Sequence, residues 1–201
     1  MINTFFIAFI MAYVGLIAPG MLNMNACKIS LSRGLKEAMM FSIGASIIVL
    51  LQAGVALFFA GFLKKNPEII DFLKYAGILV FFLLAIFFFI QARKELKMNK
   101  EIKKGNPFLA GIGLSSINML SIPYYLGLSS YGETKGWIKL TYPDTLTFVI
   151  GAAFGVFALL ATYSYFAKVI MEKSQFLAKN TNYILAGLFL ILGVITLIQV
   201  L

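Results

Sequence analysis

Hydrophobic residues in this chain gather into six long runs that contain no Asp, Glu, Lys or Arg. The uncharged runs are 1–27, 38–63, 75–92, 105–132, 145–167 and 180–201. Each run reaches the ~18 residues at which a membrane-spanning helix becomes the expected structure. Strands of a membrane barrel are about 10 residues long and alternate in polarity, whereas the stretch 79–90 is apolar throughout. The pattern therefore predicts an all-α polytopic membrane protein with six transmembrane helices.

The expected helices and their connections fill the chain as a single transmembrane domain, 1–201. We predict spans at 2–27, 38–63, 69–92, 106–132, 145–167 and 180–201, with a basic cytoplasmic loop at 93–105. This loop divides the chain into two three-helix halves. Because three is odd, the second half enters the membrane in the opposite direction to the first, as in the inverted repeats of many transporters. Six helices without an internal repeat are the alternative.

Composition excludes several other classes of protein. The chain is 61% hydrophobic and 12% charged, whereas soluble domains average about 25% charged residues. The net charge of +9 comes from residues in the short loops, so it does not indicate a nucleic-acid partner. The chain has no histidine, and Cys27 is its single cysteine. We therefore expect no metal site, no cofactor and no internal disulfide.

Basic residues are distributed unequally between the two sides of the predicted membrane. The first, third and fifth loops contain three, six and three Lys or Arg residues, whereas the second and fourth contain three and two. Cytoplasmic loops carry the excess of positive charge. We therefore expect a multi-pass protein of the bacterial inner membrane, with these three loops in the cytoplasm and both termini outside.

Prolines interrupt two of the predicted spans at similar depths. Pro19 lies in the first span and Pro123 in the fourth. Proline removes a backbone donor and disturbs the carbonyl one turn earlier, and in lipid such freed groups must find partners in protein or in a water-filled cavity. Matching breaks in corresponding segments indicate a transporter binding site, and ordinary proline kinks are the alternative. We predict that the two breaks face each other across a central polar cavity.

Polar side chains accompany both prolines. Gly15, Pro19 and Asn23 are four residues apart, which would place them on one face of a continuous helix. Ser115, Asn118 and Tyr125 would similarly form one stripe. Amide side chains both donate and accept hydrogen bonds, as a polar solute requires, although bonds between helices are their commoner use. The candidate substrate pathway comprises Pro19, Gly20, Asn23, Asn25, Gln52, Ser115, Asn118 and Pro123.

Small and aromatic residues are expected to pack or to face lipid. A stripe of small residues runs along the second span through Ala38, Ser42, Ala45, Ala53, Ala56 and Ala60. Gly151 and Gly155 have the GxxxG spacing in the fifth span. Small residues let membrane helices approach closely, so both are predicted packing surfaces, with a homodimer interface as a less favoured use. The aromatic side chains are expected mostly to face lipid, with Tyr131, Trp137 and Tyr142 as anchors at the interface.

The segment 15–45 resembles the signature of the LysE/RhtB family of amino-acid exporters. In that family a Pro-Gly-Pro-Asn-like stretch ends helix one, and a basic, glycine-containing turn leads into a glycine-rich second helix. Pro19 and Gly20 match the first part, and the turn 32–34 matches the second. A second family mark is an Asn-Pro pair in helix four after a Phe-x-x-Gly opening. The stretch 108–111 is similar to the opening and Asn118 to the asparagine, whereas Met119 follows it and the proline comes at Pro123. The resemblance covers essentially the whole chain.

The resemblance implies a secondary transporter that exports a small amino acid or a related metabolite, driven by an ion or proton gradient. It implies a binding role for Pro19, Gly20, Asn23 and Asn118. A passive channel is the first alternative, because none of the uncharged runs contains a carboxylate for proton relay. A non-transporting membrane scaffold is the second. A membrane enzyme is the least favoured, because the chain has no His and no acid within its predicted spans.

Overall fold

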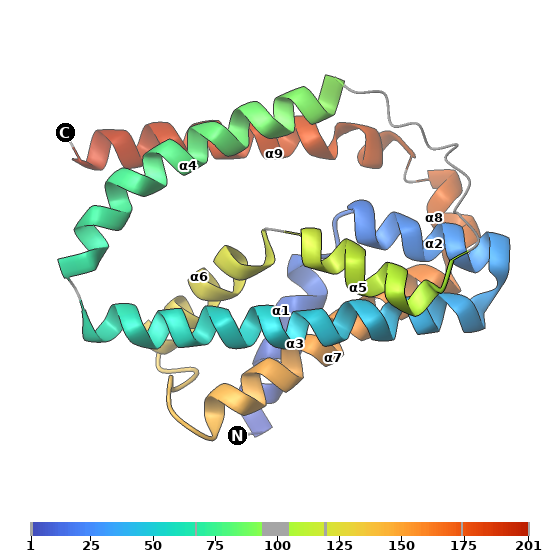
Figure 1. Ribbon diagram of the computed structural model, residues 1–201, viewed down its shortest axis with the longest axis horizontal. Helices are drawn as coiled ribbons and strands as arrows, with labels where there is room; N and C mark the ends of the chain where they lie inside the picture. The colour runs from blue at the N-terminus through green and yellow to red at the C-terminus, as the bar shows by residue number, and fades with distance from the viewer. Residues whose placement is uncertain (1, 67, 94–104, 119, 174, 201) are drawn as a thin grey trace. The chain divides into compact units, whose positions relative to one another are not determined.

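A computed structural model describes residues 2–66, 68–93, 105–118, 120–173 and 175–200 (Figure 1). Within these ranges the secondary structure is helical, without strands. The helices are α1 (Ile2–Gly15), α2 (Met21–Arg33), α3 (Leu35–Lys65), α4 (Glu68–Arg93), α5 (Pro107–Ile117), α6 (Ser121–Thr134), α7 (Asp144–Tyr165), α8 (Ala167–Lys173) and α9 (Gln175–Val200). The basic loop predicted at 93–105 lies outside the described residues except for its two end residues.

The all-α prediction is confirmed, and two of the predicted spans are divided. Four predicted spans correspond to single helices, α3, α4, α7 and α9, whereas the first is divided between α1 and α2 and the fourth between α5 and α6. Among the described residues, α3 and α7 are long and apolar enough to cross a membrane. Shorter apolar helices cover Ile2–Gly15, Gly77–Ile90, Pro107–Ile117 and Tyr183–Ile198. The six-span topology stays a prediction.

The chain forms two compact units. Unit 1 contains Met1–Phe62 and Glu101–Lys173, and unit 2 contains Leu63–Lys100 and Ser174–Leu201. Each unit takes one segment from each half of the chain, so the units differ from the halves that the central loop separates. The prediction of a single transmembrane domain is not tested by this division and stays a prediction.

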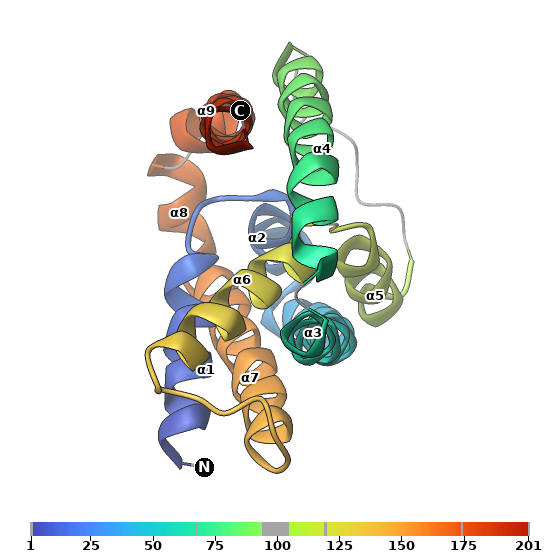
Figure 2. The same cartoon turned by 90° about the vertical axis from the view of Figure 1, so that its left-hand side faces the viewer.

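Glycines allow pairs of helices in unit 1 to approach closely. A Cβ atom on Gly151 would collide with the carbonyl oxygen of Phe5, so α7 lies directly against α1. In the same way, a Cβ on Gly44 of α3 would collide with the carbonyl of Phe108 in α5. The views in Figures 1 and 2 also place α3 beside α5. Close backbone approach at small residues is the usual basis of helix packing in membranes.

The predicted packing surfaces are used inside unit 1. The six residues of the predicted stripe on α3 are all buried, namely Ala38, Ser42, Ala45, Ala53, Ala56 and Ala60. Gly155, the second glycine of the GxxxG pair, faces Phe9 and Ala12 of α1. These surfaces therefore hold helices of one chain together. The homodimer remains an untested prediction and gains no support from them.

Unit 2 consists mainly of α4 and α9, which pack along each other. Phe189 of α9 stacks on Phe81 and Phe88 of α4, with ring centroids 6.2 and 5.7 Å apart. Gly193 leaves room for Phe82 one turn further along. The other large side chains that the structure describes on α4 and α9 are mostly exposed apolar groups, as lipid-facing helices require.

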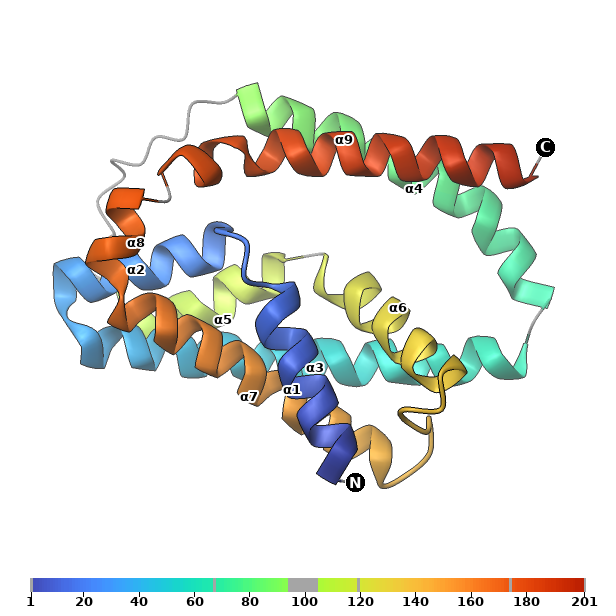
Figure 3. The same cartoon turned by 180° about the vertical axis from the view of Figure 1, so that it is seen from behind.

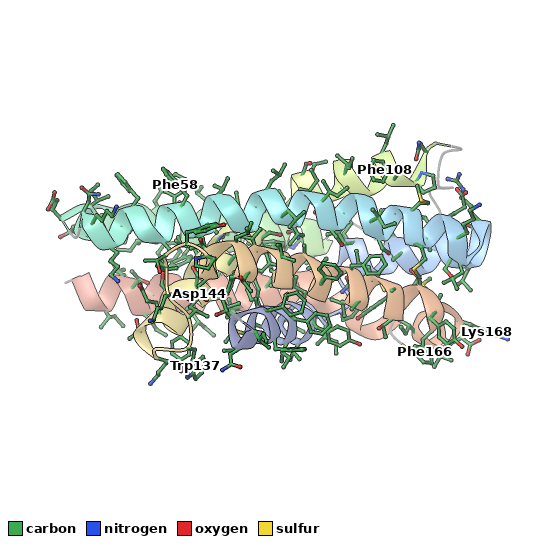
Figure 4. All side chains as sticks on the ribbon, turned by 90° about the horizontal axis from the view of Figure 1, so that it is seen from below. Phe58, Phe108, Trp137, Asp144, Phe166 and Lys168 are labelled. Atoms are coloured by element: carbon green, nitrogen blue, oxygen red, sulfur yellow. The ribbon has the colours of Figure 1, made fainter. Side chains whose placement is uncertain are left out.

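Polar contacts mark the two ends of unit 1. At one end, Nη1 of Arg33 donates to the carbonyl of Gly105 at 2.8 Å, and α8 packs against α2. At the other end, the hydroxyl of Thr4 donates to the carboxylate of Asp144 at 3.2 Å. Figure 4 shows Asp144 and Lys168 at these opposite ends. Described parts of the first, third and fifth predicted loops thus lie together, as the predicted alternation of spans requires.

Candidate functional site

The first break separates α1 from α2 at residues 16–20, where Pro19 lies (Figure 3). The backbone of Gly20 is extended, with φ −94° and ψ −179°, and its N–H donates to the carbonyl of Ala18 at 2.7 Å. The expected interruption near Pro19 is therefore present. The expectation that Gly15, Pro19 and Asn23 share one helix face is wrong, because α1 ends at Gly15 and the chain then changes direction.

Side chains satisfy the carbonyl groups that the first break releases. Nδ2 of Asn23 donates to the carbonyls of Leu16 and Ala18, at 2.9 and 2.8 Å. The hydroxyl of Tyr163, from α7, donates to the carbonyl of Ile17 between them. Asn23 is only 6% exposed. Carbonyl groups outside a regular helix need such donors within a membrane, because no bulk water reaches them there, so these two residues hold the break in its irregular conformation.

Asn25 does not join the first break. Its Nδ2 donates to the carbonyl of Met21, one turn earlier in the same helix, at 2.7 Å. Other residues of α2 bind α7 instead. The thiol of Cys27 donates to the backbone carbonyl of Tyr163 at 3.1 Å, and the hydroxyl of Ser30 donates to the backbone carbonyl of Ser164 at 2.6 Å. These bonds fix α2 against the last turns of α7.

The second break separates α5 from α6 at residues 118–120, of which 118 and 120 are described. Asn118 caps α5, and its N–H donates to the carbonyl of Ser115 at 3.0 Å. Pro123 lies two residues after the first residue of α6. N–H groups in this first turn have no partner within the helix, so a proline there costs no hydrogen bond. The break therefore comes before Pro123 and not at it. Ser115, Asn118 and Tyr125 consequently do not share the face of a continuous helix.

Gln52 of α3 binds the second break. Its Nε2 donates to the carbonyls of Ser115 and Asn118, at 2.9 and 3.4 Å. Gln52 is 8% exposed and Ser115 is fully buried. Three buried oxygens have no hydrogen-bond partner among the described residues, namely Oε1 of Gln52, Oγ of Ser115 and the hydroxyl of Tyr125. The second break is thus held by one amide and retains unused acceptors.

The two breaks are held in corresponding ways by the opposite halves of the chain. Tyr163 reaches the first break from α7, which belongs to the second half, and Gln52 reaches the second break from α3, which belongs to the first. The close glycine contacts also join opposite halves of the chain. Helix α7 of the second half packs on α1 of the first, and α3 of the first half packs on α5 of the second. Glycines with positive φ also follow α2 and α6, at Gly34 and Gly136. The inverted relation of the two halves stays a prediction.

Tyr124 of α6 joins the two halves directly. Its hydroxyl donates to the carbonyl of Met11 in α1 at 2.7 Å. The phenol lies where a Cβ atom on Gly15 would be, so a side chain at that position would displace it. Tyr124 thus links α6 to the end of α1 that leads into the first break.

Sequence reasoning missed both tyrosines. It assigned most aromatic side chains to the lipid, whereas Tyr163 and Tyr124 each donate to a carbonyl near the first break. The available signal was chemical: a phenol within a long uncharged run must find an acceptor when it is buried. Gln52, by contrast, was expected in the pathway and does contact the second break.

The site contains no charged group among the residues that hold the breaks. In the described part of the chain, no three His, Cys, Asp or Glu side chains gather as metal ligands. The chemistry available at both breaks is therefore neutral hydrogen bonding by amides, hydroxyls and backbone carbonyls. Such groups suit the recognition of a polar solute, without acid–base catalysis.

A family model described as LysE type translocator matches residues 13–200. The matched span includes both breaks and all the candidate pathway residues. No curated protein and no solved structure matches the chain.

Proposed function

The chain belongs to the LysE type translocator family and is therefore a membrane transporter, and from this premise we propose that it exports amino acids or related small polar solutes. The observation that carries the proposal is the pair of breaks at corresponding positions of the two halves. Polar side chains gather there in an otherwise apolar chain. Discontinuous helices of this kind form the substrate sites of many secondary transporters.

In the proposed mechanism one half of the chain rocks against the other to expose the breaks alternately to each side of the membrane. The hydrogen bonds that join the halves near the breaks include those from Tyr163 to Ile17, from Gln52 to Ser115 and from Tyr124 to Met11. They connect neutral groups, and neutral hydrogen bonds contribute only about 0.5–1.5 kcal/mol each. Rearranging them is therefore compatible with a cycle of opening and closing.

We place the protein in the bacterial inner membrane, with the ends of the first, third and fifth loops in the cytoplasm. The distribution of basic residues supports this orientation. The contact between Arg33 and Gly105 fits it, because both residues belong to predicted cytoplasmic loops. The solute would then leave the cytoplasm from this end of unit 1.

A metabolite comparison tests the proposed function. The growth medium of cells that overexpress the protein is compared with that of cells that lack the gene. We expect at least one amino acid or related metabolite to accumulate outside the overexpressing cells. Equal extracellular concentrations of every small polar metabolite in the two cultures would contradict export.

A passive channel is the second candidate function. The absence of Asp and Glu from all six uncharged runs favours it, because proton-coupled carriers often use an intramembrane acid. Transport measured in proteoliposomes that contain the purified protein distinguishes a proton-coupled carrier from a passive channel. A carrier coupled to protons accumulates solute against its gradient when a pH difference is imposed, whereas a channel only equilibrates it.

A further inference from the structure

The second break contains a group of buried oxygen atoms that the fold itself does not use. Oε1 of Gln52, Oγ of Ser115 and the hydroxyl of Tyr125 have no partner among the described residues. The three residues are 8%, 0% and 0% exposed. Buried polar atoms are almost always paired in proteins, so an unpaired group next to a helix break indicates a place for a ligand.

Gln52 and Ser115 lie next to each other at the end of α5. The Nε2 atom of Gln52 is 2.9 Å from the carbonyl oxygen of Ser115, which belongs to the last turn of that helix. Tyr125 lies on the buried face of α6 and belongs to the core cluster that includes Val49 and Ala53. Gln52 and Ser115 thus place two of the three oxygens side by side at the second break.

The orientation of these groups follows from their neighbours. The Gln52 amide must direct Nε2 at the carbonyls of Ser115 and Asn118, because Oε1 in that position would face two acceptors. Ser115 also differs from other serines of the described helices. Ser46 and Ser116 each donate to the carbonyl four residues earlier, both at 2.8 Å, whereas Oγ of Ser115 makes no such bond.

The chemistry of the group favours a ligand that donates hydrogen bonds or is positively charged. An amide oxygen only accepts, and a hydroxyl oxygen can accept. The C-terminal end of a helix also carries a partial negative charge, and Ser115 lies at such an end. No Lys or Arg occurs in the uncharged runs that supply these residues. A carboxylate could accept from the Ser115 hydroxyl but would face the Gln52 oxygen as a second acceptor, whereas an ammonium group has donors for both oxygens.

We propose that the second break binds a monovalent cationic group through Gln52 Oε1 and Ser115 Oγ. The group is either the ammonium end of the transported solute or an inorganic cation such as Na⁺. The first source rests on the proposed function, because it makes this region the part of the pathway that recognises an amine. The second makes it a site for a coupling ion.

Thermal denaturation of the full-length protein in lipid nanodiscs tests the proposal. Methylammonium chloride or sodium chloride replaces choline chloride at constant ionic strength, because choline has no N–H donor. A ligand that binds the folded state raises the melting temperature. We expect one of the two cations to do so for the wild type and for Ser116→Ala. For Ser115→Ala the concentration that gives the same shift should rise roughly tenfold or more.

The cation that raises the melting temperature identifies the cationic group that binds. A shift with methylammonium indicates the amine of a solute, and a shift with Na⁺ indicates an inorganic ion. Two results would overturn the proposal: no shift of the wild type by either cation, or equal responses of Ser115→Ala and Ser116→Ala. Without added cation, Ser115→Ala should melt at or above the temperature of the wild type, because it loses only an unpaired buried group. The metabolite comparison does not depend on these outcomes, so failure here leaves export itself untouched.

Discussion

At the scale of single residues, three neutral donors hold the two breaks. Asn23 and Tyr163 occupy the carbonyls of the first break, and Gln52 occupies those of the second. A charged donor would hold these carbonyls more strongly but would be costly within a membrane. Amides and phenols satisfy the backbone without that cost. They also leave the breaks able to rearrange.

Tyr163→Phe tests whether the Tyr163 hydroxyl stabilises the first break. The substitution removes the hydroxyl that donates to Ile17 and leaves a carbonyl of the first break without its partner in a nonaqueous environment. We expect a loss of about 1–3 kcal/mol in the free energy of unfolding, measured by denaturant titration in detergent. Tyr165→Phe is the matched control, because Tyr165 lies on the same helix and is 72% exposed. Equal stability of the two variants would show that the Tyr163 bond does not hold the break.

At the scale of elements, glycines and breaks determine how the helices of unit 1 fit together. Gly151 and Gly155 bring α7 against α1, and Gly44 and Gly111 bring α3 against α5. Each close pair includes one continuous helix and one half of a broken helix. The continuous helix thereby reaches the break and supplies the donor that satisfies it.

Gly151→Ala tests this packing. A methyl group there would collide with the backbone of Phe5, which cannot move aside as a flexible side chain can. We expect overpacking to destabilise the protein by about 1–3 kcal/mol, seen as a lower melting temperature. Gly54→Ala, on the other continuous helix, serves as the control, because a methyl group there would meet no other atom within 4 Å. If both variants melt together, the close approach of α1 and α7 is not what stabilises unit 1.

Sequence reasoning predicted these elements unevenly. The uncharged runs located the helices because charge is excluded from lipid, and Pro19 correctly indicated the first break. Pro123 misplaced the second by a few residues, because proline fits the first turn of a helix as well as a break. The partners of the breaks were not predictable, since periodicity does not say which helices are neighbours. The sequence pattern around Tyr163 does not distinguish it from a tyrosine that faces lipid.

At the scale of the whole molecule, the family match confirms the resemblance of the sequence to this group of transporters. The two halves are connected crosswise, with Tyr163 and Gln52 each serving the break of the other half. Movement of one half must therefore change the environment of both breaks. This coupling is what an alternating-access carrier requires, and it does not depend on a charged residue at either break.

The proposed orientation gives a whole-molecule prediction. Alkaline phosphatase fused after Leu201 should be active, because that enzyme folds only outside the cytoplasm, and a fluorescent protein at the same place should stay dark. A fluorescent protein fused within the central basic loop should fluoresce, because that loop is predicted to be cytoplasmic. The opposite pattern at both positions would reverse the orientation and the direction of transport.

In the proposed mechanism, solute passes along the two breaks. Transport by purified variants in proteoliposomes shows whether it does. Efflux of labelled amino acids is measured for the wild type, Asn23→Ala, Asn118→Ala and Asn25→Ala. Asn25 is the control, because it bonds within its own helix. We predict efflux of at least one amino acid by the wild type and Asn25→Ala, and rates lower by roughly tenfold for the other two variants. Wild-type rates for Asn23→Ala and Asn118→Ala would contradict the claim.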